Sequence, residues 1–165
     1  KIIMIYLLII KLHIIFAGMW LINLAANPIL RSSVVHNKNK SGEKKFIQLY
    51  LTFANLFGMI GGLGILATGI SMVAESPVYG FFQFSANHWL ATKQILMVIL
   101  LIILGAIIIP TSKKVRAAIG SDFEKTEQLS DDVYNNLNKL FKWNLVINII
   151  VLINFLLAIT HNFLV

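Results

Sequence analysis

Four long apolar stretches dominate this chain of 165 residues and leave few folds open to it. They run from about residues 2 to 30, 46 to 74, 89 to 110 and 143 to 164. About 20 helical residues cross the roughly 30 Å hydrocarbon core of a bilayer, so each stretch is long enough to span it. The sequence therefore predicts an all-α fold, an integral membrane four-helix bundle that forms one domain over residues 1–165.

The composition agrees with a chain embedded in lipid. Apolar residues make up 58% of the sequence and charged residues only 13%, which is too apolar for a soluble domain of this length. Cysteine is absent, so disulfides, thiol catalysis, iron–sulfur clusters and cysteine-based zinc sites are excluded. Any metal or electron chemistry must then use His, Lys, Met or carboxylates.

The positive charges indicate how the spans are oriented. The net charge is +7, and eleven of the 14 Lys and Arg residues lie in two polar segments, 31–45 and 111–142. Cationic loops stay on the cytoplasmic face, so both termini and the aromatic loop 75–88 are expected outside. We expect the lipid bilayer of a bacterial inner (cytoplasmic) membrane and no nucleic acid, because base-stacking aromatics do not accompany these charges.

The second polar segment is expected to contain a helical extension of the fourth span into the cytoplasm. Ser130 is a plausible helix cap. After it, apolar residues recur at helical spacing at Val133, Leu137, Leu140 and Phe141. The fourth helix is thus predicted to begin well before the apolar span, with the charged face of the extension in water.

Ionisable side chains inside a bilayer are costly, so each is a functional candidate. With the predicted orientation, five of them fall in the outer half of the membrane: Lys11, His13, His88, Lys93 and His161. Each has a simpler explanation to weigh. His88 and His161 would be solvated at the interface, and Lys93 could extend its stem to the surface. His13 is too deep for either explanation, which makes it the strongest candidate.

Two imidazoles on facing helices are the usual way in which a membrane bundle holds haem b. His13 with His88 or His161 fits that scheme. Lys11 and Lys93 could then pair with the haem propionates or with another anionic ligand. Trp20 lies mid-span and is expected to pack inside the bundle or to face lipid.

The inner half carries amides and glycines instead of ionisable groups. Asn23 and Asn27 are four residues apart, as are Asn144 and Asn148, so each pair shares a helix face. They are predicted to form hydrogen bonds across the bundle, with an inner ligand site as the alternative. Gly58 and Gly62 are spaced to let a neighbouring helix backbone approach closely.

The string Lys11-Leu12-His13-Ile14-Ile15, followed by Trp20 and Pro28, closely resembles the first helix of the bacterial four-helix membrane protoporphyrinogen oxidases (HemJ type). It is similar, more loosely, to CopD-like copper-resistance membrane domains. The segment with Trp89 and Lys93 resembles that family's third helix, and residues 43–46 leading to 68–70 resemble its second. The resemblance covers about two thirds of the chain.

The resemblance implies a haem-binding membrane oxidoreductase that oxidises protoporphyrinogen IX, a tetrapyrrole, and passes electrons to the respiratory chain. In it, His13 would be the haem-associated histidine and catalytic together with Lys93, while His88, His161, Lys11 and Trp20 complete the candidate cofactor site. The alternative is a noncatalytic accessory subunit of a larger respiratory or photosynthetic membrane complex, or a homo-oligomer. A copper carrier is a further alternative, with Met4 and Met72 as outer-layer ligand candidates.

Overall fold

The computed structural model of the chain describes residues 2–120 and 128–160, and every regular element among them is a helix. Four of the resulting rods are long and apolar enough to cross a membrane. This confirms the predicted all-α class and the number of spans. The elements are α1 (Ile2–His36), α2 (Glu43–Ala74), α3 (Phe84–Ile103), the π-helical η1 (Leu104–Ile108), α4 (Ile109–Ile119) and α5 (Asp131–Thr160).

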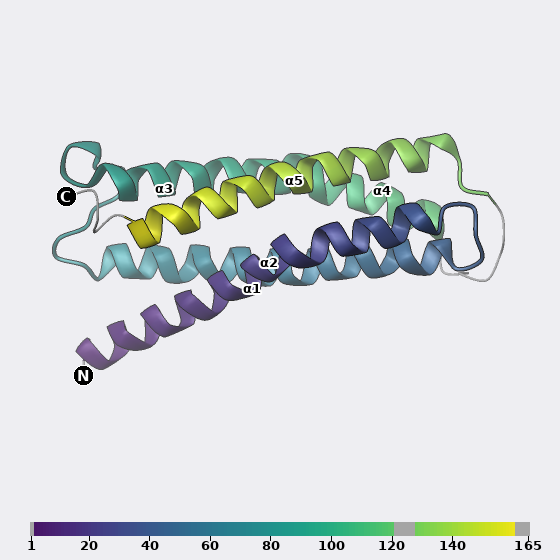
Figure 1. Cartoon of the computed structure of the whole chain (residues 1–165). Helices are drawn as coiled ribbons and strands as arrows, with labels where there is room; N and C mark the ends of the chain where they lie inside the picture. Colours follow the sequence, from purple (N-terminus) through teal and green to yellow (C-terminus); the bar gives the residue numbers. More distant parts are fainter. Residues whose placement is uncertain (1, 121–127, 161–165) are drawn as a thin grey trace.

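The rods run roughly alongside one another, and α3, η1 and α4 form one continuous rod (Figure 1). α1 packs chiefly on α2, whereas α5 packs on α3, on α4 and on α1. The N-terminal part of α1 diverges from the other helices (Figure 1). Its apolar side chains there are exposed in the isolated chain, as expected for a surface that meets lipid: Met4, Ile5, Leu7, Leu8, Leu12, Ile14 and Ile15.

Large side chains of α1 pack against glycines of α2, and the two helices run antiparallel. The ring of Phe16 lies where a Cβ on Gly64 would stand, and the indole of Trp20 covers Gly62. At Gly61 a Cβ would lie only 3.2 Å from the backbone of Phe16 and Trp20. The predicted close approach of two helix backbones therefore occurs, but at Gly61. The predicted pair, Gly58 and Gly62, contacts side chains of α1 instead.

Pro28 and Pro110, near the ends of the first and third apolar stretches, lie inside longer helices. α1 continues through Pro28 to His36, and Val34 beyond the proline is buried in the core. Pro110 follows η1, whose wider π-turn accommodates a ring that would clash in a regular helix. The helices consequently extend past the apolar stretches that predict them.

Most of the buried core lies in the half of the bundle where α1 connects to α2. The predicted positions Val133, Leu137, Leu140 and Phe141 are all buried there, and α5 begins directly after Ser130, as expected. The Glu43 carboxylate accepts hydrogen bonds from the Tyr134 hydroxyl at 2.9 Å and from the backbone N–H of Asn39 at 3.0 Å. These bonds fasten the start of α5 to the α1–α2 turn.

Candidate functional site

His13 of α1 lies against α2, and its contact there is polar. Its Nδ1 is 2.8 Å from Oγ1 of Thr68, and its ring edge lies close to Gly69, where a Cβ would be 3.6 Å from Cε1. Thr68 is buried, whereas His13 is half-buried. The imidazole is thus held by α2 on one edge only.

The hydrogen bonds of Thr68 favour one tautomer of His13. The hydroxyl of Thr68 lies 2.6 Å from the backbone oxygen of Gly64, one turn earlier, which can only accept its proton. Oγ1 is then left to accept from His13, the arrangement of an imidazole protonated on Nδ1. In a neutral imidazole this leaves Nε2 with a free lone pair, which can bind a metal or accept a proton.

Lys93 of α3 is the second ionisable group of this region. It is half-buried and interacts electrostatically with His13 across the bundle. Its Nζ lies 5.7 Å from the centre of the Trp89 ring, within the range of a cation–π contact. The two residues that the family resemblance pairs as catalytic therefore lie within electrostatic range of each other, on helices α1 and α3 that have little direct contact.

Trp20 lies two turns deeper along α1 on the same face as His13. Its side chain is 3% exposed and rests on the glycines of α2. Of the two expected placements, inside the bundle or facing lipid, the structure shows the first, and Trp20 lies two helical turns from His13 on the same helix face. Lys11 is exposed on another face of α1, because residues two apart do not share a helix face.

The two other histidines do not extend this cluster. His88 is exposed near the start of α3, where its backbone oxygen accepts a hydrogen bond from Thr92. His161 lies outside the described residues. Within the described part of the chain, no three His, Asp or Glu side chains come together in a way that could hold a metal ion.

The buried amides between His13 and the basic end of the bundle form a separate polar layer. Asn144 donates to the Tyr50 hydroxyl of α2, one of the cross-bundle bonds that the sequence predicts. Asn23 and Asn27 are buried, yet their Oδ1 atoms have no hydrogen-bond partner. The layer therefore tethers α5 to α2 and leaves two amide oxygens of α1 unsatisfied inside the bundle.

The sequence alone does not mark two contributors to these polar groups. Thr68 stands out only as part of a family-like segment, and no pattern singles out Tyr50. Both carry a hydroxyl within an otherwise apolar stretch, and this is the signal that they share, because a hydroxyl surrounded by lipid needs a hydrogen-bond partner.

Comparisons with known proteins add no relative to this picture. No family model, curated protein or solved structure matches the chain. The site must be interpreted from its own geometry.

Proposed function

We propose that this protein is a haem-binding membrane oxidoreductase that acts on a tetrapyrrole, as its resemblance to the HemJ-type protoporphyrinogen oxidases implies. The hydrogen bond from His13 to Thr68 carries the proposal. A histidine that ligates a metal usually donates its other N–H to a neighbouring acceptor, which fixes the ring and its tautomer. His13 has that arrangement, with Nε2 left for the iron.

The residues of the site suit haem b in two respects. His13 supplies a neutral imidazole, the commonest axial ligand of haem iron. Lys93 supplies a cation on α3, and an ammonium suits the propionates of haem or of a porphyrinogen. When bound, haem would supply one-electron redox chemistry. His13 would hold and orient it, while Lys93 would position the anionic edge of the tetrapyrrole.

We further propose that both termini and the site lie on the outer side of a bacterial inner membrane, with the α1–α2 turn in the cytoplasm. The support is the charge distribution, since Lys and Arg gather at the end of the bundle opposite His13. The start of α5 would then form the cytoplasmic extension. Reactivity of single engineered cysteines towards a membrane-impermeant maleimide tests this: Asn39→Cys should react only after permeabilisation, and Ser76→Cys before it.

The second candidate function is that of a noncatalytic subunit in a larger membrane assembly. The N-terminal part of α1, which diverges from the other helices (Figure 1), favours it, because its exposed side chains are largely apolar. Size-exclusion chromatography in mild detergent separates the two candidates. A haem-loaded monomer or homodimer supports the oxidoreductase, whereas co-purification at stoichiometric amounts with other membrane subunits, without haem, supports the accessory role.

Activity is the direct test of the oxidoreductase proposal. Membranes that contain the protein should convert protoporphyrinogen IX to fluorescent protoporphyrin IX, and both His13→Ala and Lys93→Gln should reduce the rate by at least tenfold. Lys139→Gln, an exposed charge change on α5, is the matched control and should leave the rate unchanged. Oxidation that is equally fast in the two site variants would contradict the proposal.

A further inference from the structure

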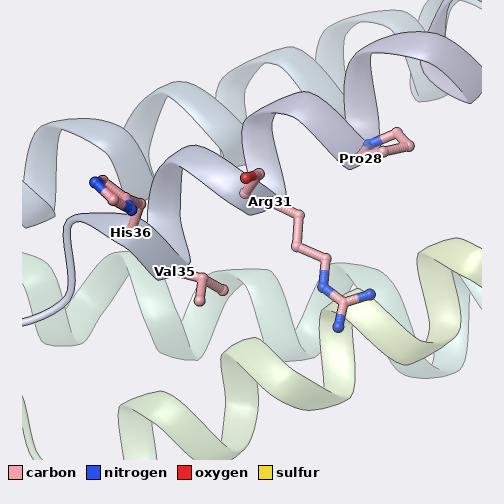
Figure 2. Close-up of a pocket in the computed structure, with 5 residues that line it drawn as sticks. Pro28, Arg31, Val35 and His36 are labelled. Atoms are coloured by element: carbon pink, nitrogen blue, oxygen red, sulfur yellow. The ribbon is translucent and has the colours of Figure 1, made fainter.

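A shallow groove, open to its surroundings, lies on one face of α1 near the end that leads into the basic turn. Its volume is about 410 Å³, and its lining residues all belong to α1: Pro28, Arg31, Ser32, Val35 and His36. Figure 2 shows the Arg31 side chain extending away from α1 toward α5. There its Cζ lies 5.4 Å from the centre of the Phe141 ring. A cation that lies over an aromatic ring therefore stands at one side of the groove.

Arg31 is placed to recognise an anion. A guanidinium stacked on a ring keeps its N–H groups free at its edge, and these can bind a phosphate in a bidentate manner. Among the described residues, Arg31 contacts the ring of Phe141. The buried carboxylate at this end of the bundle, Glu43, is bonded to Tyr134 and Asn39 instead.

The rest of the groove is amphiphilic. Ser32 and His36, one turn apart, add a hydroxyl and an imidazole, whereas Pro28 and Val35 are apolar. The neighbouring Ile29 is 66% exposed. Beyond the groove, Lys38, Lys40, Lys44 and Lys45 add positive potential. A ligand that combines a phosphate with an apolar part fits this lining better than a free ion does.

The position of the groove along the span identifies the class of ligand. It lies where the apolar sequence of α1 gives way to the basic turn, which is the depth of the lipid headgroups on either face of a membrane. We propose that this groove binds the headgroup of an anionic phospholipid, with the phosphate on Arg31 and the remaining headgroup atoms along Ser32 and His36. This site is independent of the one at His13.

Native mass spectrometry of the purified protein in a neutral detergent tests the proposal. Phosphatidylglycerol, phosphatidylcholine and inorganic phosphate are titrated in separate experiments. The proposal predicts retention of phosphatidylglycerol in preference to the other two. Arg31→Gln should weaken its binding about fivefold or more, the effect of one basic residue near an anionic surface. Lys114→Gln, an exposed lysine of α4 that does not line the groove, should change it less than twofold.

Two further variants keep the test decisive if Arg31→Gln does not fold. Arg31→Lys keeps the charge but loses the planar fork, so it should bind with intermediate affinity. Ser32→Ala should weaken binding about threefold by removing one hydroxyl. Equal losses in the arginine variants and Lys114→Gln would overturn the proposal, because diffuse charge would then explain binding. Equal affinity for inorganic phosphate or for phosphatidylcholine would also overturn it.

Discussion

Thr68 holds the imidazole of His13 through a hydrogen bond of 2.8 Å between Oγ1 and Nδ1, and this bond joins α1 to α2. The geometry makes Thr68 a positioning residue for whatever binds at Nε2. Replacing Thr68 by Val keeps the shape of the side chain and removes the acceptor. We expect haem affinity to fall by about 10- to 100-fold, the usual effect of losing such a partner.

A titration of the haem-free protein, followed at the Soret band, measures that affinity. Thr68→Ser restores the hydroxyl and should bind haem nearly as well as the native protein. Native affinity in Thr68→Val would show that the hydrogen bond does not orient a ligand.

Lys93 is predicted to act on the carboxylates of the tetrapyrrole and not on the iron. Lys93→Gln should therefore retain a haem spectrum typical of His13 ligation while binding haem roughly fivefold to tenfold more weakly, because one charge-assisted contact is lost. The dimethyl ester of haem has no free carboxylate, so native protein and variant should bind it alike. An equal loss of affinity for haem and its ester would assign Lys93 a structural role instead.

The contact of α1 with α2 at Gly61 should be sensitive to a single methyl group. Gly61→Ala places a Cβ 3.2 Å from backbone atoms of Phe16 and Trp20, and backbone cannot move aside as a side chain can. We expect a loss of about 1 to 3 kcal/mol in the free energy of unfolding, measured in mixed micelles by titration with a denaturing detergent.

Gly18→Ala is the matched control for that change. Gly18 is also in a spanning helix, but a Cβ at this position would have no neighbouring atom within 4 Å. Its replacement should be neutral or stabilising by up to about 1 kcal/mol, since Ala favours helix. Equal effects of the two changes would contradict the close packing at Gly61.

The bond between Tyr134 and Glu43 should stabilise the bundle at its basic end. Tyr134→Phe removes the hydroxyl that donates to a buried carboxylate. The expected cost is about 1.5 kcal/mol of unfolding free energy, the lower range for a hydrogen bond to a charged group. Tyr79→Phe, whose ring contact with Trp89 needs no hydroxyl, should cost less than about 0.5 kcal/mol. Similar stabilities of the two variants would show that the bond contributes little.

Hydrophobic length and periodicity were enough to predict the helices and much of the core. The spacing of Val133, Leu137, Leu140 and Phe141 indicated a buried face, and all four are buried. The ends of the apolar stretches indicate the helix ends less well, because the helices continue through Pro28 and Pro110 into polar sequence. Packing beyond Pro28 and a π-turn before Pro110 allow both helices to continue.

Residue types could indicate the site only in part. His13 and Lys93 stood out because ionisable groups are costly in lipid. Thr68 and Tyr50 did not, since a hydroxyl is common in spanning helices and its partner depends on which helices face each other. The proposed lipid-binding role of Arg31 has no signal in the sequence either, because a cation beside a basic loop indicates only orientation. The structure adds that its guanidinium lies over the ring of Phe141.

The absorption spectrum of the native protein, purified gently in mild detergent, tests the central claim most directly. The account predicts a Soret band in the native protein and its loss or strong reduction in His13→Ala, with folding confirmed for both by circular dichroism. A native protein without a Soret band that also fails to bind added haem, or a His13→Ala variant with an unchanged haem spectrum, would contradict it.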